Sequence, residues 1–479
     1  MKRGIIAVGG YLPQLRLDRK AYARDLAWSG LPMPRVGYRA VAGWDEDALT
    51  MALEAAKGLA ATAPEALRPD VLRFVSTSAY FTDRAQATIL KDALALADNV
   101  RTSDHANSRR AGTTALLDAL LGNGDELVVA GEKRQTQAGS AAQLSYGDGA
   151  AAVRIGPDGP ARLVGHTSLS HDLVDRYTSR EHPTPYAYEE RFVRDTAVEK
   201  LIVPAVRAAC AAAGIEPAAL AHVACAEPVG GCWRAAAKAL RCAAVNHAET
   251  LSAQAGDLGA AHPMYALGLA LGAAQPGEHV LVVGFGSGVD ALVFAVDGPV
   301  PGAAELAAQL AEGEALTGTS RFLHLAGSLS LDWGMRAEFA QKAQATVLER
   351  TGRDMIGFIG GRDSTGNVQF PRSAYPVNPA LDAVETMEPV RLADLEATVV
   401  SVTADRLNFS PDPPFDFGLV QFDNGARVLM ELVDRLPAGF HVGQRVRMRL
   451  RIKALNTALG FRTYFWKAAP LARPQLGGA

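Results

Sequence analysis

The stretch ALLDALLGNGDELVVAGE at residues 115–132 has a counterpart in LGLALGAAQPGEHVLVVGFG at residues 267–286. Each stretch reads as a helix of small residues, a break containing glycine, an acidic residue and an apolar strand ending in glycine. The strands are short, continuous apolar runs, which is typical of strands covered by helices on both faces of a sheet. A helix–strand unit that recurs in this way predicts a duplicated α/β fold.

Two further pairs of segments repeat in the same order. Residues 55–78 match residues 206–228, since in both a helix and a turn containing proline and glutamate precede a buried strand. Residues 145–156 match residues 284–296, where a Gly-rich turn leads into a β-rich run. We therefore expect residues 1 to about 300 to hold two copies of one unit. Their Ala- and Gly-rich helices can pack closely, which predicts α/β/α/β/α layers with the central helices between two sheets.

The sequence changes character after Gly302. Residues 303–350 have helical patterns, and from about residue 352 apolar and polar residues alternate with the period of two typical of strands. Asp423-Asn424-Gly425 indicates a tight hairpin. Such a series of strands predicts a small closed β-barrel of the OB type. The expected regions are 1–160 for the first α/β half, 161–350 for the second half with a helical extension, and 351–479 for the barrel region.

Composition and charge exclude several classes of function. The 479 residues include 48 Lys+Arg and 51 Asp+Glu, a net charge of −3, whereas a general nucleic-acid binder needs a basic surplus. No apolar run reaches about 18 residues, so neither a transmembrane helix nor a membrane partner is expected. The opening MKRGIIAVGGYLPQLRL reads as a strand and turn, not as a signal peptide. All four cysteines lie within residues 210–242, which excludes a disulfide framework across the chain and favours a reducing, cytoplasmic setting.

Several stretches of the duplicated part together resemble 3-hydroxy-3-methylglutaryl-CoA (HMG-CoA) synthases and ketoacyl synthases of the thiolase superfamily. They are GIIAVGGYLPQLRLDR (4–19), GWDEDALTMALEAA (43–56), NSRRAGTTALLDAL (107–120), SYGDGAAAV (145–153) and VVGFGSGVDALVF (282–294). The C-terminal part resembles the thiolase-associated OB-fold domain that begins with a zinc ribbon. Its resembling stretches are GNVQFPRSAYP (366–376), VVSVTADRLNFSPDPPFDFGLVQFDNGAR (399–427) and VGQRVRMRL (442–450).

The resemblance implies an active site with three catalytic side chains. A cysteine nucleophile stands at the N-terminus of a buried central helix, whose dipole lowers the thiol pKa, and a glutamate and a histidine complete the site. In this sequence the cysteine position falls on Arg109 and the glutamate position on Ser78. The histidine position falls on Ala226, with Glu227 as the neighbour that could occupy the same space. All three catalytic residue types are therefore replaced.

Arg109 cannot take over the role of a nucleophile, because a guanidinium stays protonated up to a pKa above roughly 12. Ser108 is a poor replacement because nothing in the sequence positions a base beside it. The family's asparagine-like position falls on Asp257, and a buried charge requires a partner, so we expect an Arg109–Asp257 ion pair. Two alternatives are that Arg109 binds a substrate carboxylate or a CoA phosphate, and that a loop shift displaces it to solvent.

The remaining polar residues have more ordinary interpretations. His105 and the GFGSG turn with Gly286 and Ser287 are weak candidates for lining a CoA-thioester pocket. Cys225 and Cys232 read as small buried residues. The four cysteine positions of the family's zinc ribbon fall on non-ligating residues, so no zinc is expected: Arg362, Thr365, Tyr375 and Asn378.

These observations lead to one expected function and two alternatives. The resemblance implies an HMG-CoA synthase-like subunit without the nucleophile. It would act as a scaffold or CoA-thioester-binding component of a thiolase or acyltransferase complex. Its expected partners are a thiolase-like catalytic subunit, acyl-CoA and a second copy of the chain. The first alternative is an acyltransferase that forms or cleaves C–C bonds of acyl-CoA with other residues. The second is an assembly protein that acts through its OB fold.

Overall fold

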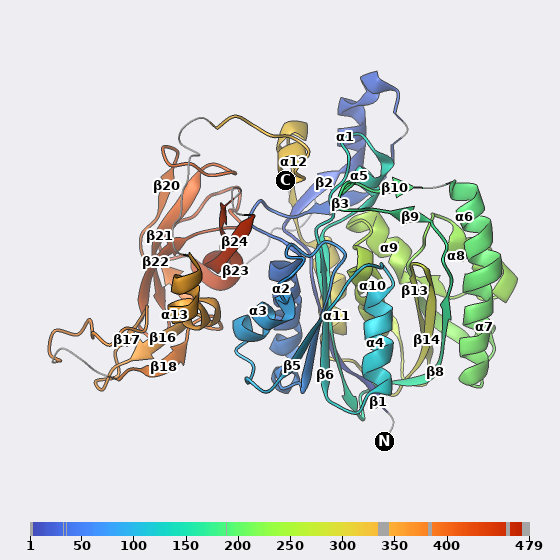
Figure 1. Cartoon of the computed structure of the whole chain (residues 1–479), viewed down its shortest axis with the longest axis horizontal. Coiled ribbons are helices and arrows are strands. Elements are labelled where there is room, and N and C mark those ends of the chain that lie inside the picture. Colours follow the sequence, from blue (N-terminus) through green and yellow to red (C-terminus); the bar gives the residue numbers. More distant parts are fainter. Residues whose placement is uncertain are drawn as a thin grey trace.

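The computed structural model describes residues 3–31, 33–34, 36–187, 189–333, 344–381, 386–456 and 460–471. Two bodies lie side by side, the α/β body and a smaller β-rich domain formed by the C-terminal part of the chain (Figure 1). Among these described residues, no helix is both long and apolar enough to cross a bilayer.

One sheet of ten strands runs through the α/β body, and its two halves have the same topology. The order is β12-β11-β13-β14-β8-β1-β7-β6-β4-β5. The first half contains β1 (Arg3–Tyr11), β4 (Val71–Val75), β5 (Arg101–His105), β6 (Glu126–Glu132) and β7 (Gly149–Pro157). The second contains β8 (Ala161–Ser170), β11 (Leu220–Cys225), β12 (Val245–Asn246), β13 (His279–Phe285) and β14 (Gly288–Val296).

The pairing directions repeat along with the order. In the first half β4 is parallel to β5 and β6, while β7 is antiparallel to β6 and β1. In the second half β11 is parallel to β12 and β13, while β14 is antiparallel to β13 and β8. The halves join where β1 pairs with β8. The three repeated segments found in the sequence occupy equivalent places in these halves.

Helices form three layers against the two halves of this ten-stranded sheet (Figure 1). The outer layers contain α2 (Ala48–Thr62) and α3 (Gln86–Ala93) on one side, and α6 (Glu190–Thr196), α7 (Val203–Ala212) and α8 (Cys232–Leu240) on the other. The central layer contains α4 (Ala111–Leu121), α9 (His247–Gln254) and α10 (His262–Ala273). An added Cβ at Gly112 in α4 would collide with the carbonyl oxygen of Ala260. Small residues are thus what allows the central helices to approach one another.

Short elements complete the α/β body. The strands are β2 (Leu15–Asp18), β3 (Tyr38–Val41), β9 (Arg176–Tyr177), β10 (Tyr186–Ala187) and β15 (Glu314–Ala315). The helices are α1 (Arg19–Asp25), α5 (Ala141–Ser145), α11 (Ala303–Ala311) and α12 (Thr319–Leu325). Short 3-10 turns are η1 (Ala27–Ser29), η2 (Pro64–Leu67), η4 (Pro217–Ala219) and η5 (Gly259–Ala261), and a π-helical segment, η3 (Ala197–Ile202), joins α6 to α7.

The C-terminal domain is a barrel preceded by a helix and a small sheet. Its elements are α13 (Gln344–Gly357), the sheet of β16 (Ile359–Arg362), β17 (Val368–Gln369) and β18 (Glu388–Arg391), and the barrel strands β19 (Ala397–Val399), β20 (Thr403–Asp405), β21 (Phe415–Phe422), β22 (Arg427–Glu431), β23 (Arg445–Asn456) and β24 (Phe461–Pro470). The predicted hairpin joins β21 to β22, and the bridge between Leu432 and Ala468 brings the end of β22 against β24. The predicted fold class, a duplicated α/β domain followed by a β-barrel, is confirmed.

The expected start of β structure near residue 352 is wrong. Helix α13 continues to Gly357, because its last turn packs into the barrel, where the Trp466 indole N–H donates to the carbonyl of Ile356 at 2.7 Å. Residues 334–343 of the expected helical extension lie outside the described residues. The region bounds at 160 and 350 remain a prediction.

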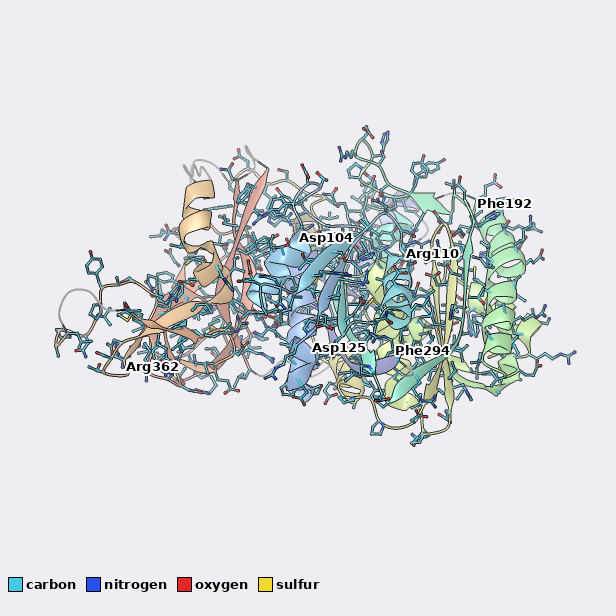
Figure 2. All side chains as sticks on the ribbon, turned by 60° about the horizontal axis from the view of Figure 1, so that its bottom comes forward. Asp104, Arg110, Asp125, Phe192, Phe294 and Arg362 are labelled. Atoms are coloured by element: carbon cyan, nitrogen blue, oxygen red, sulfur yellow. The ribbon has the colours of Figure 1, made fainter. Side chains whose placement is uncertain are left out.

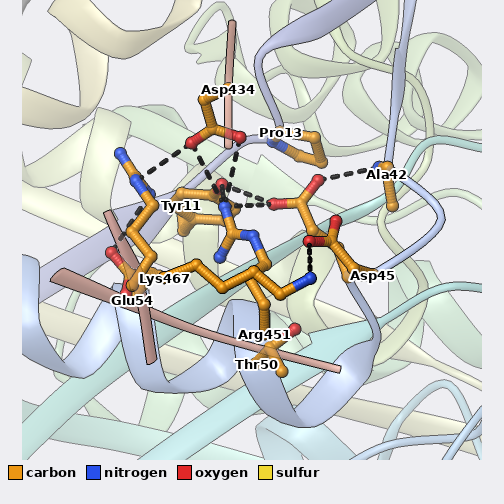
Figure 3. A network of polar contacts seen from close by, with 12 residues as sticks. Tyr11, Pro13, Ala42, Asp45, Thr50, Glu54, Asp434, Arg451 and Lys467 are labelled. Carbon is orange, nitrogen blue, oxygen red and sulfur yellow. Dashed lines mark hydrogen bonds and ion pairs between the residues drawn. The ribbon is translucent and has the colours of Figure 1, made fainter. Parts of the chain in front are cut away.

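A buried charge network joins the two bodies (Figure 3). Three acidic residues just before α2 and one within it pair with cations on the last two barrel strands. The pairs are Asp45–Lys467 (2.9 Å), Glu46–Arg451 (3.0 Å), Asp47–Arg462 (2.9 Å) and Glu54–Arg449 (3.0 Å). The Tyr11 hydroxyl adds a donor to Glu46 at 2.6 Å. The barrel is thereby fixed against α2 and the loop that precedes it.

Candidate functional site

A cavity of about 2160 Å³ lies between the α/β body and the barrel. From the α/β body it is lined by the loops that follow β4 and β5, by the segment after β6 and by the loop after β8. From the C-terminal domain it receives the 408–411 loop and residues of β21 to β24. Five of the predicted site residues line this cavity: Ser78, His105, Arg109, Gly286 and Ser287.

Arg109 lies in the turn that leads into α4, at the predicted nucleophile position. Its guanidinium forms an ion pair with Asp175, from the loop after β8, and the two side chains are only 13% and 7% exposed. The expected Arg109–Asp257 ion pair is therefore wrong, and so is displacement of Arg109 to solvent. Asp175 takes the place of Asp257 because the loop after β8 folds over the start of α4. Burial lowers the pKa of Arg109, and the nearby positive charge of Arg176 lowers it further.

Asp257 is held by two other arginines. Its carboxylate accepts from Arg176 at 2.9 Å, lies 3.4 Å from Arg134 and accepts the Gly259 N–H at 2.8 Å. Burial alone would raise the pKa of Asp257, but Arg134 and Arg176 hold it well below its ordinary value. The Tyr146 ring contacts both guanidinium groups, since its centroid lies 3.7 Å from Arg134 Cζ and 4.8 Å from Arg176 Cζ. Arg109, Arg134, Arg176, Asp175 and Asp257 will be called the arginine cluster.

Glu132, the last residue of β6, is a polar residue that sequence reasoning missed. It is fully buried and accepts the Ser78 hydroxyl at 2.5 Å, the Thr77 hydroxyl at 2.8 Å and the Ala260 N–H at 3.1 Å. A carboxylate thus stands beside Ser78, the position where the family has its glutamate. The signal was present, since Glu132 ends the repeated stretch at 115–132, but an acid at a strand end reads equally well as a turn residue.

Glu227 has a structural role. Its carboxylate accepts the N–H groups of Gly231 (2.9 Å) and Trp233 (2.5 Å) at the start of α8, although burial raises its pKa. Neither Glu227 nor Ala226 is among the residues that line the cavity. The expectation that Glu227 occupies the histidine's space in the pocket is wrong, because the amides at the start of α8 draw its carboxylate to themselves.

The hydroxyl of Ser108 is also already in use. It donates to the Gly286 carbonyl at 3.0 Å and accepts the Arg110 N–H at 3.1 Å, which closes the GFGSG turn against the start of α4. His105 lies at the end of β5, where burial and the charge of Arg73 lower its pKa. Among the described residues, the hydroxyl of Ser108 therefore makes no hydrogen bond to a side chain that could act as its base.

Lys133 connects the cavity wall with the loop at the domain junction. Its ammonium donates to the carbonyls of Gly43 (2.7 Å) and Glu46 (3.0 Å), and burial lowers its pKa. The following residue, Arg134, belongs to the arginine cluster. Two consecutive residues after β6 thus serve the domain junction and the cavity.

The residues at the four cysteine positions of the zinc-ribbon resemblance do not fit a zinc ion. Thr365 accepts from the Asn378 amide at 3.0 Å, Arg362 pairs with Glu388 at 3.3 Å, and Tyr375 is 68% exposed. Guanidinium, hydroxyl and amide groups do not form the thiolate or imidazole set that structural zinc needs. Within the described ranges, no group of three or more His, Cys, Asp or Glu is placed to hold a metal. Figure 2 shows Arg362 at the outer end of the small domain, away from Arg110 at the start of α4.

Comparisons with known proteins agree with this architecture. A family model described as the C-terminal OB-fold domain of ChsH2 matches residues 389–451. The hydroxymethylglutaryl-CoA synthase of Thermococcus gammatolerans is 27% identical over 305 residues, which are 61% of this chain and 85% of the relative. That of Pyrobaculum neutrophilum is 28% identical over 306 residues, covering 61% and 86%.

Solved structures share the fold of the α/β body. MvaS in complex with 3-hydroxy-3-methylglutaryl coenzyme A has a TM-score of 0.57 at 19% identity, covering 68% of this chain and 91% of that one. FabH from Pseudomonas aeruginosa, a 3-oxoacyl-(acyl carrier protein) synthase III, has a TM-score of 0.53 at 20% identity, covering 63% and 99%. The α/β body therefore has the fold of HMG-CoA synthases and 3-oxoacyl-(acyl carrier protein) synthases III, and an OB-fold domain follows it. In sequence the chain is similar to hydroxymethylglutaryl-CoA synthases, and its C-terminal part is similar to the OB-fold domain of ChsH2.

Proposed function

We propose that this chain binds a CoA thioester in the cavity between its two bodies without accepting the acyl group itself. It would serve as the nucleophile-free component of a complex that contains a thiolase-like catalytic subunit. The observation that carries the proposal is Arg109, which stands at the nucleophile position and is paired there with Asp175. A protonated guanidinium has no electron pair with which to attack a thioester.

Three features support a CoA thioester as the ligand. One structural neighbour is described as HMG-CoA synthase complexed with CoA. The cavity is larger than the roughly 300–1,000 Å³ of an ordinary small-molecule site, which suits a long ligand. Cations from both bodies line the cavity where they are exposed or half-buried, and they can bind strongly hydrated phosphates: Arg84, Lys453 and Arg462.

Ser108 and the four cysteines are unsuited to carry an acyl group. The hydroxyl of Ser108 is bound to the Gly286 carbonyl. All four cysteines are buried. Burial raises the pKa of Cys232 to about 11 and holds that of Cys225 well above its ordinary value, so neither thiol forms appreciable thiolate near neutral pH.

The proposed complex gives the chain a scaffolding role. A barrel fixed to the α/β body by buried ion pairs moves with that body as one unit, so a partner docked on either body would keep its position relative to the cavity. A homodimer and a cytoplasmic setting belong to the same proposal.

Titration calorimetry with CoA and acetyl-CoA, together with purification of the tagged full chain from its native cells, tests this proposal. We expect binding of acetyl-CoA and near-stoichiometric recovery of a polypeptide identified by mass spectrometry as thiolase-like. Turnover of acyl-CoA by the isolated chain would overturn the nucleophile-free role. Absence of binding to either CoA compound would overturn the ligand assignment.

A second candidate function is an acyltransferase that uses other residues, and one observation favours it. The Ser78 hydroxyl donates to the buried carboxylate of Glu132 at 2.5 Å, and Ser78 lines the cavity. If this pair supported catalysis, the isolated chain would turn over acyl-CoA, and Glu132→Gln would abolish that turnover. On our primary proposal, wild type and variant are equally inactive.

A further inference from the structure

The arginine cluster has more positive than negative groups among its ion-paired members. Three guanidinium groups, those of Arg109, Arg134 and Arg176, face two carboxylates, those of Asp175 and Asp257. Glu132 lies near the cluster, but its oxygens accept hydroxyl and backbone N–H groups, and it forms no ion pair with a residue of the described chain. Three guanidinium groups thus share two ion-paired carboxylates, which leaves N–H donors unpaired at a buried site, and such donors favour a ligand that accepts them.

The arginines retain unused donors on the side of the cavity. Each guanidinium has five N–H donors in a planar fork. Among the described residues, Arg109 uses only one nitrogen, toward Asp175, and Arg176 uses one, toward Asp257. The Arg134 side chain is only 9% exposed, and its buried Nε has no hydrogen-bond partner. All three arginines line the cavity, and the free N–H groups of Arg109 and Arg176 are the donors that a ligand there could use.

Position in the cavity selects the kind of anion. Arg109 and Arg176 are only 13% and 16% exposed, whereas the cations on the open side, such as Arg84 and Lys453, are exposed. Phosphates carry more charge and lose more hydration on burial, so they fit the open side better. A carboxylate pairs well with a planar guanidinium fork, and at the end of an acyl chain it would reach the buried side.

We propose that Arg109 and Arg176 together bind a carboxylate at the far end of the acyl chain, so that the ligand is the CoA thioester of a dicarboxylic acid. This inference rests on the proposed function, because it assigns the acyl group of the same ligand. The lowered pKa of Arg109, caused by burial and by the charge of Arg176, is consistent with two guanidinium groups close enough to share one anion.

The test compares two thioesters of equal chain length on the full chain. Glutaryl-CoA carries a terminal carboxylate and valeryl-CoA does not. We expect glutaryl-CoA to bind at least about tenfold more tightly, since a hydrogen bond to a charged group commonly contributes that much. Equal affinities would overturn the carboxylate subsite and leave the proposed function intact. Binding of neither thioester would instead contradict the proposed function.

Variants assign the effect to named residues. Arg176→Gln and Arg109→Gln should each reduce the preference for glutaryl-CoA to about twofold or less while retaining valeryl-CoA binding, which also reports that the variant is folded. The matched control is Arg191→Gln, which removes the same charge from a side chain that is 93% exposed on α6, and it should keep the full preference. If Arg176→Gln weakened the binding of both thioesters and of free CoA equally, the Arg176 guanidinium would bind a CoA phosphate, and the proposal would be wrong.

Discussion

At the scale of single residues, the candidate site is a set of charges whose partners differ from those expected. The location of Arg109 at the start of a helix was predictable, because the run Ala111-Gly112-Thr113 fixes the register of that helix. Its partner was not predictable, since Asp175 lies 66 residues further along the chain, in the loop after β8. Glu132 was missed for a related reason, because only the folded chain brings Ser78 to it.

Replacing Asp257 tests the arginine cluster at this scale. Asp257→Asn keeps the size of the side chain but leaves Arg134 and Arg176 without their carboxylate. We expect a loss of about 3 kcal/mol in the free energy of unfolding, measured by urea denaturation at pH 7. The control is Asp172→Asn on the neighbouring loop, an exposed aspartate that should change stability by less than about 0.5 kcal/mol. Equal effects of both variants would contradict the assignment.

The lowered pKa of Asp257 also predicts how the stability difference between wild type and Asp257→Asn depends on pH. A carboxyl group whose pKa is depressed by folding contributes stability at any pH above its unfolded value of about 3.9. That contribution is lost as the pH falls through the pKa of the folded state. The stability difference between wild type and Asp257→Asn should therefore be constant near neutrality and shrink below about pH 4. A difference that grew on acidification would be inconsistent with this sign.

At the scale of helices and strands, the order of the sheet followed from the repeat, because buried strands and small-residue helices leave strong apolar signals. The end of α13 did not follow, since contacts with the barrel extend that helix past the point where its own pattern weakens. The short strands β9 and β10 carry no pattern of their own, yet β9 supplies Arg176 to the cavity.

Glycine substitutions measure how tightly the central helices pack. In α4, Gly112→Ala would place a Cβ against the carbonyl oxygen of Ala260, and we expect a loss of about 1–3 kcal/mol. In α2, a Cβ at Gly58 would meet only the Gly10 carbonyl oxygen at 3.5 Å, so Gly58→Ala should stabilise the protein by about 0.5–1 kcal/mol. Thermal and urea unfolding show whether Gly112→Ala lowers and Gly58→Ala raises the free energy of unfolding. A harmless Gly112→Ala would show that the layers have room to spare.

At the scale of the whole molecule, the barrel and the α/β body share a buried charged junction, and one of its pairs, Asp47–Arg462, lines the cavity. Arg451 is fully buried and pairs with Glu46 (3.0 Å) and Asp434 (3.3 Å). The sequence contained the acidic run at 45–47, but nothing in it indicated that the basic partners would come from the end of the chain. The junction therefore had to be found in the structure.

Breaking the junction should loosen both bodies. Arg451→Met leaves the buried carboxylate of Glu46 without its cation, while Asp434 keeps Arg449 at 3.1 Å. We expect a loss of about 3 kcal/mol together with a separate unfolding step for the barrel. Arg445→Met is the control, because its pairs with Asp423 and Glu396 are exposed and contribute less than about 1 kcal/mol. Differential scanning calorimetry distinguishes one transition from two. A single unshifted transition for Arg451→Met would show that the junction does not couple the bodies.

The central claim, that this chain holds a CoA thioester but does not accept its acyl group, is tested most directly by intact-protein mass spectrometry after saturation with acetyl-CoA. Arg109→Cys is the positive control, since it places a thiol at the start of α4, where the helix dipole favours the thiolate, and it should gain the mass of one acetyl group. The wild-type chain is predicted to keep its mass unchanged while bound acetyl-CoA is recovered intact. An acetyl adduct on the wild-type chain would contradict the account.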